Sequence, residues 1–187
     1  MSENKKLIIG LVDADLMDGG TRHPNLVMLK LAGFLHDNNI PFELIEDEND
    51  DIEKYHLVYI SKVFTFTKDP KFHKNTKLEG KVDKFRFGGT GYYATETNIS
   101  KFRKSRAEDM SQLENDSFLN QYPNKRGGRK TMGIDMERQM PYYHLYDKYV
   151  KRKIEEGKKK TYFKDYLDYS IGFLTRGCFR HCPFCVN

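Results

Sequence analysis

Near its start the chain carries a continuous apolar run, LIIGLVD, at residues 7–13. A run of this length that ends in an acid is typical of a strand buried on both faces of a parallel sheet. After the loop ADLMDGGTRH, the segment PNLVMLKLAGFLHDNN has the apolar spacing of a helix over 24–39, with Pro24 in its first turn. A buried strand followed by a loop and a helix constrains the fold more than any other feature of the sequence.

Two further β-prone runs follow, IPFELIED at 40–47 and HLVYISKVFTF at 56–66. Strand, helix, strand and strand at this spacing begin an α/β domain. We therefore expect a doubly wound, Rossmann-like parallel sheet over residues 1–95, with right-handed crossovers. Ligands of such sheets bind beyond the carboxyl ends of the strands, which here are the loop 13–23 and the region after Phe64.

The stretch FRFGGTGYY, at 85–93, predicts a short strand that runs into glycines. Gly88, Gly89 and Gly91 would allow the backbone to approach a cofactor closely, and a tight turn explains them equally well. From 96–165 the chain is polar and poor in aliphatic residues, and it includes NKRGGRK and KRKIEEGKKK. We expect a basic linker or insertion there, with one or two amphipathic helices.

The length of 187 residues suffices for one ordinary domain, or for one domain and a fragment of another. The net charge of +5 is mild, so it fits a solvated surface as well as an anionic partner such as nucleic acid. No targeting segment and no membrane span are visible. The three cysteines lie within eight residues, which is unlike a disulfide framework, and we expect a cytoplasmic protein.

All cysteines of the chain lie in GCFRHCPFC, as Cys178-x3-Cys182-x2-Cys185. A structural zinc ion requires four ligands, whereas three thiolates can hold three irons of a [4Fe–4S] cluster and leave the fourth iron open. Zinc with His181 or a more distant residue as fourth ligand is the alternative, although His181 adjoins Cys182 and simultaneous ligation would be strained. Thiols without a metal are a further alternative.

This cysteine spacing, with the aromatic Phe184 before the last cysteine, resembles the signature of the radical SAM superfamily. The strand expected at 169–175 is similar to the first strand of the partial (β/α)6 barrel of that family. The resemblance implies that Cys178, Cys182 and Cys185 each ligate one iron and that S-adenosylmethionine chelates the fourth. One electron, from a reductant such as flavodoxin or ferredoxin, would then cleave the sulfonium to methionine and a 5′-deoxyadenosyl radical, which abstracts a hydrogen from a substrate.

Further roles of the cysteine loop follow from the same resemblance. Phe184 would pack near the adenine of S-adenosylmethionine and orient it through its backbone, or it would serve as a hydrophobic plug beneath the cluster. Arg176 and Arg180 flank the loop. They would raise the cluster potential or meet an anionic group, and exposed surface arginines are the alternative.

The N-terminal part resembles the cobalamin-binding-like module that many radical SAM proteins carry, in IIGLVDAD, HPNLVMLKLAGF, LVYISKVFTFT and FGGTGY. MPYYHLY, at 140–146, is similar to a later landmark of that arrangement. The cobalt-ligating motif of the module, Asp-x-His-x-x-Gly, is absent. His23 lies in the corresponding loop, but a single histidine before a proline is more typical of a surface or helix-capping residue. Cobalamin therefore fits the fold without support from a motif.

The chain ends at Asn187, before the later strands that the resemblance implies. We therefore expect 166–187 to be the start of a radical SAM core, in an N-terminal part that is inactive by itself. The alternative is a zinc-stabilised nucleic-acid-binding module, whose contacts would lie in 151–160 and among the tyrosines of 142–149. An enzyme that modifies tRNA would combine the two.

Overall fold

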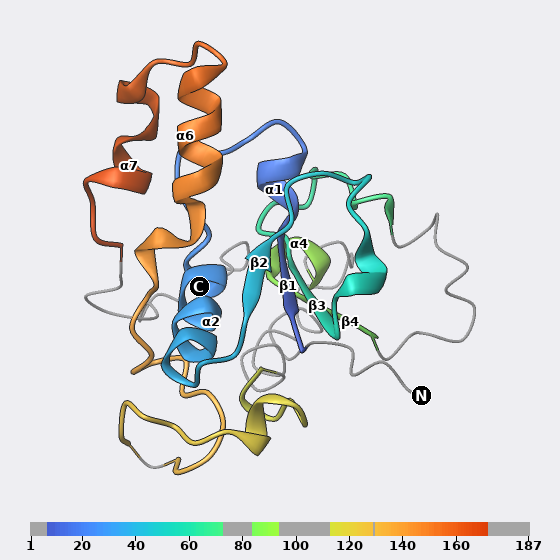
Figure 1. Cartoon of the computed structure of the whole chain (residues 1–187), viewed down its shortest axis with the longest axis vertical. Coiled ribbons are helices and arrows are strands. Elements are labelled where there is room, and N and C mark those ends of the chain that lie inside the picture. The colour runs from blue at the N-terminus through green and yellow to red at the C-terminus, as the bar shows by residue number, and fades with distance from the viewer. Residues whose placement is uncertain (1–6, 73–83, 94–112, 129, 172–187) are drawn as a thin grey trace, which may run out of the picture.

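The computed structural model describes residues 7–72, 84–93, 113–128 and 130–171 (Figure 1). Its strands are β1 (Ile9–Asp13), β2 (Phe42–Leu44), β3 (Leu57–Ser61) and β4 (Phe85–Gly88). Its α-helices are α1 (Ala14–Met17), α2 (Leu26–Asp37), α4 (Thr90–Tyr93), α6 (Asp147–Glu155) and α7 (Lys164–Leu167). Its 3-10 helices are η1 (Ile52–Lys54), η3 (Leu119–Gln121), η4 (Tyr143–Tyr146) and η5 (Lys160–Phe163). The expected α/β class is confirmed.

The four strands form one parallel sheet in the order β2-β1-β3-β4. In the register of this sheet Asp13 pairs with Ser61, and Ser61 pairs with Gly88. The three strands β1, β3 and β4 therefore end at the same level and share one carboxyl edge. The chain leaves β1 toward β2 on one side and returns to β3 on the other, so the strand order reverses between β1 and β3.

Helix α2 lies within the segment predicted to be helical, and its capping residue explains where it begins. Asn25 rather than Pro24 marks the start, because the Asn25 Oδ1 accepts hydrogen bonds from the backbone amides of Val27 and Met28. After the helix, Asn39 adopts a φ of 57°, and the chain turns there toward β2.

Apolar side chains cover both faces of the sheet, because successive residues of a strand point to opposite sides. On the α2 face, Leu11 and Tyr59 belong to one core with Leu31 and Leu35 of the helix. The opposite face has a second, smaller core. It consists of Val12, Ala14, Ile45, Ile52, Tyr55, Val58, Ile60, Phe72 and Phe85.

The described parts of the predicted linker 96–165 join the α2 core rather than only connecting two units. Their buried residues in that core are Phe118, Leu119, Ile134, Met136, Leu145, Tyr146, Tyr149, Val150 and Phe163. Contact with α2 is close, since a Cβ at Gly33 would lie 2.1 Å from the carbonyl oxygen of Met140. Helix α6, beside α7 in Figure 1, is amphipathic as predicted, because Tyr149 and Val150 are buried while most of its other residues are exposed.

Strand β3 ends at Ser61, five residues before the predicted end of the β-prone run at 56–66. Beyond it, the backbone amides of Val63 and Phe64 donate to the carboxylate of Asp15 instead of to a neighbouring strand. A side chain that is distant in the sequence therefore ends the strand. Of the strand predicted at 169–175, only 169–171 are described, and they are not in a strand.

Candidate functional site at the carboxyl edge of the sheet

Asp13 is the last residue of β1 and is almost completely buried, with 1% of its surface exposed. Its Oδ2 accepts a hydrogen bond of 2.9 Å from the hydroxyl of Tyr146. Its Oδ1 accepts one of 3.3 Å from the backbone amide of Leu16 and so caps α1. Burial raises the pKa of the Asp13 carboxyl to about 6, against the lowering effect of these hydrogen bonds.

Tyr146 extends this contact to α2 and β3. Its hydroxyl oxygen lies 3.3 Å from the backbone nitrogen of Asn25, which donates to it. The side-chain amide of Asn25 in turn donates to the Ser61 hydroxyl at 2.9 Å. Burial raises the pKa of Tyr146 well above its ordinary value, so the phenol stays protonated and donates to Asp13. One buried network thereby joins β1, α2, β3 and η4 at the point where the strand order reverses.

The loop after α1 is held in place by hydrogen bonds and an ion pair to residues of the C-terminal part of the described chain. The hydroxyl of Tyr166 lies 2.9 Å from the Thr21 Oγ1 and donates toward the carbonyl oxygens of Thr21 and His23. The imidazole of His23 pairs through Nδ1 with Asp165, and 74% of its side chain is exposed. These are the contacts of a surface histidine held by a carboxylate.

Asp15 fastens the loop that follows β3. Its buried carboxylate accepts hydrogen bonds from the amide of Val63 at 2.7 Å, from the amide of Phe64 at 3.3 Å and from the hydroxyl of Thr67. The loop presents two exposed rings, Phe64 and Phe66, which stack with centroids 5.2 Å apart. A carboxylate that satisfies three donors holds the loop in one conformation.

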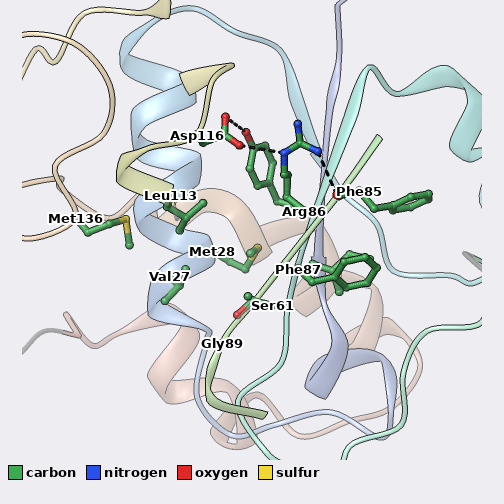
Figure 2. A pocket seen from close by; sticks show the side chains of 13 residues that line it. Val27, Met28, Ser61, Phe85, Arg86, Phe87, Gly89, Leu113, Asp116 and Met136 are labelled. Atoms are coloured by element: carbon green, nitrogen blue, oxygen red, sulfur yellow. Dashed lines mark hydrogen bonds and ion pairs between the residues drawn. The ribbon is translucent and has the colours of Figure 1, made fainter. Parts of the chain in front are cut away.

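A cavity of about 350 Å³ lies on the α2 side of β3 and β4 (Figure 2). Figure 2 shows Met28 and Leu113 on one side of this cavity and strand β4, which carries Arg86, on the other. The end of the cavity at the carboxyl edge is formed by Ser61 and Gly89. The β3–β4 half of the carboxyl edge therefore borders a cavity, whereas the β1 half is filled by the hydrogen-bonded side chains of Asp13, Asn25 and Tyr146.

The opposite end of the cavity carries an ion pair. The Nε of Arg86 donates to the Oδ2 of Asp116 at 3.2 Å, and the Tyr59 hydroxyl donates to its Oδ1 at 3.1 Å. The same Oδ1 accepts from the backbone amides of Phe118 and Leu119, each at 2.9 Å. Asp116 therefore fixes the start of η3 and the guanidinium of Arg86 together.

The glycines after β4 serve a tight turn, one of the two roles predicted for them. Gly89 has a φ of 99°, and a Cβ there would lie 2.3 Å from the carbonyl oxygen of Lys62. At Gly91 a Cβ would lie 2.7 Å from the carbonyl oxygen of Phe64. Side chains are thus excluded because two stretches of backbone meet.

The predicted cluster ligands Cys178, Cys182 and Cys185 lie outside the described residues, as do Phe184, predicted to contact S-adenosylmethionine, and Arg176, Arg180 and His181. Within residues 7–72, 84–93, 113–128 and 130–171, no group of three or more His, Cys, Asp or Glu side chains is arranged to hold a metal ion. In the same part of the chain, no helix has both the length and the apolar character needed to cross a membrane.

Comparison of the chain with models of protein families, with curated proteins and with solved structures finds no match.

Sequence reasoning located the carboxyl edge but missed most of the side chains that form it. Asp13 lies at the end of the apolar run 7–13, and that position could have identified it, whereas Ser61 lies inside the β-prone run 56–66 and no sequence signal singles it out. Tyr146 and Asp116 come from the segment predicted to be a linker, where no periodic pattern distinguishes them. Only their contacts across the fold reveal their roles.

Proposed function

We propose that this chain carries the cluster loop of a radical SAM enzyme, with Cys178, Cys182 and Cys185 as the three protein ligands of a [4Fe–4S] cluster. The observation that carries the proposal is the Cys-x3-Cys-x2-Cys spacing with Phe184 before the last cysteine. The donor set suits the group, because thiolates are the usual protein ligands of iron–sulfur clusters and three of them leave one iron open. With one electron from an external reductant, the bound cluster and S-adenosylmethionine would supply methionine and a 5′-deoxyadenosyl radical for hydrogen abstraction.

One feature of the described structure supports the proposal. The parallel α/β sheet is compatible with a Rossmann-like domain ahead of a radical SAM barrel.

Cobalamin is left out of the proposal. The sequence lacks the cobalt-ligating motif, and the described contacts of His23 are a pairing with Asp165 at the protein surface.

A zinc-stabilised nucleic-acid-binding module is the second candidate, and the structure limits its proposed contact surface. Tyr146 and Tyr149 are buried in the α2 core, so their rings are not accessible to bases. On α6, Arg152 and Lys153 already pair with glutamates, which reduces the positive field of that helix. Two of the tyrosines and two of the cations of the predicted contact surface are thus already engaged, while Lys151, Lys158, Lys159 and Lys160 are exposed.

Anaerobic reconstitution with iron and sulfide tests the proposal, because the two candidates require different metals. We expect about four irons in each chain. We also expect an electron paramagnetic resonance signal of the reduced cluster that changes when S-adenosylmethionine is added. Replacement of Cys178, Cys182 or Cys185 by alanine should each abolish the cluster signal.

The matched control is His181→Ala, which removes the nearest alternative ligand but no thiolate. We expect this variant to bind iron like the unchanged protein. Binding of one zinc ion that requires His181, with no iron–sulfur signal, would instead overturn the proposal and favour the zinc module.

A further inference from the structure

The cavity beside β3 and β4 has the size of a small-molecule site. Its volume of about 350 Å³ falls at the lower end of the range of ~300–1,000 Å³ in which ligand pockets occur. Much of its wall is apolar and comes from Val27, Met28, Leu113 and Met136. Two of these four are methionines, whose flexible thioethers adapt to ring-shaped ligands.

The charged groups of the cavity are paired within the protein. Asp116 is 7% exposed and accepts hydrogen bonds from Arg86, from Tyr59 and from two backbone amides. Arg86 also donates from Nη1 to the carbonyl oxygen of Phe85. A charged ligand would lose its hydration without gaining a counter-charge, and this cost favours an uncharged ligand.

Ser61 provides a directed polar contact at the carboxyl-edge end of the cavity. The residue is 1% exposed, and its Oγ accepts a hydrogen bond from the side-chain amide of Asn25. A serine hydroxyl can donate one hydrogen bond as well as accept. In the part of the chain that the structure describes, this hydroxyl makes one hydrogen bond, as the acceptor from Asn25, so its proton is available to a ligand.

We propose that this cavity binds an uncharged, mostly apolar ring compound that accepts a hydrogen bond from the Ser61 hydroxyl. The apolar walls contact the ring of the ligand. Because Arg86 and Asp116 neutralise each other, a net charge on the ligand is disfavoured, and Ser61 orients the acceptor atom of the ligand. This site is separate from the cysteine loop, and the inference does not depend on an iron–sulfur cluster.

Methyl NMR of the full chain with ¹³C-labelled methionine tests the proposal, with quinoline as the probe. Quinoline is a bicyclic ring with one acceptor nitrogen. We expect saturable shifts of the Met28 and Met136 methyl signals, because both residues line the cavity. Met132 and Met140 are exposed elsewhere and serve as internal controls that should stay unchanged. Equal shifts of all four signals, or no saturation, would overturn the proposed site.

Two variants separate the apolar contact from the hydrogen bond. Ser61→Ala should weaken quinoline binding about fivefold, which corresponds to the loss of one neutral hydrogen bond. It should leave the binding of indole, a ring compound that only donates, unchanged. An equal effect on both probes would contradict the role of Ser61. Val27→Phe should fill the cavity and abolish the shifts of the Met28 and Met136 methyl signals. Val63→Phe, on the exposed loop after β3, is the control and should preserve these shifts.

Discussion

The two halves of the carboxyl edge of the sheet are used differently. On the β1 side, the network of Asp13, Asn25 and Tyr146 closes the crevice with side chains of the chain itself. On the β3–β4 side, Ser61 and Gly89 border a cavity of about 350 Å³. Both halves belong to one sheet, and they differ in whether a side chain from a later segment fills the space at the edge.

This difference shows that one half of the carboxyl edge of a parallel sheet can stabilise the fold while the other half leaves space for a ligand. A buried polar group without a partner costs about 1–3 kcal/mol, so the crevice beside Asp13 is stable only with Tyr146 in place. The cavity has no such requirement, because the carboxylate of Asp116 is already satisfied by protein groups. The β3–β4 half can therefore remain open without a large loss of stability.

The largest expected effect comes from removal of the tyrosine that closes the β1 half. Tyr146→Ala should lower the free energy of unfolding by about 4 kcal/mol, because it leaves a cavity and removes the donor to the Asp13 Oδ2. Tyr146→Phe, which removes only the hydroxyl, should cost about 2 kcal/mol. Urea unfolding at pH 7 measures both. The control is Tyr162→Ala, at a position that is 40% exposed, and it should cost less than about 1 kcal/mol. Equal losses at Tyr146 and Tyr162 would show that the β1 half is not closed by Tyr146.

A smaller effect is expected at the charged end of the cavity. Asp116→Asn should lower the free energy of unfolding by about 2 kcal/mol, since it removes the negative charge that pairs with Arg86 and weakens the acceptor of the Phe118 and Leu119 amides. The same urea experiment measures this loss. Asp147→Asn is the matched control, because Asp147 is exposed and pairs at the surface with His144, and it should cost less than about 0.5 kcal/mol. If Asp116→Asn unfolds no more easily than this control, the cavity wall does not depend on the ion pair.

The smallest effect is a dependence on pH that belongs to the β1 half alone. The pKa of Asp13 is about 6 in the folded protein, while an unfolded aspartate has a pKa of about 3.9. The folded state therefore binds this proton more tightly. The stability contributed by that proton is fully present below about pH 4 and is lost as the pH rises through about 6.

Asp13→Asn removes the titration and tests this assignment. From pH 5 to pH 7.5, the stability of the variant relative to the unchanged protein should increase by about 1–2 kcal/mol. Urea unfolding at several pH values gives this difference directly, and groups common to both proteins cancel. A difference that is constant over this range would mean that Asp13 does not titrate near pH 6.

Several elements of the fold could be predicted from the sequence because their signals are local. The apolar run at 7–13 predicted β1, and the apolar spacing over 24–39 predicted α2, although its ends moved inward by two residues. The end of β3 could not be predicted from the β-prone run at 56–66. Its position depends on Asp15, which takes the hydrogen bonds that a longer strand would have used.

The sequence by itself determined the parallel α/β sheet and the cysteine spacing, because strand and helix periods and ligand gaps extend over only a few neighbouring residues. Only the tertiary structure decided that Tyr146 meets Asp13 across 133 positions of the chain, and that Asp116 meets Tyr59 across 57. Such pairs produce no periodic pattern in the sequence, because they form only when the later part of the chain packs against α2. The physical reason is that a buried polar group needs a partner in space, at whatever distance along the chain that partner lies.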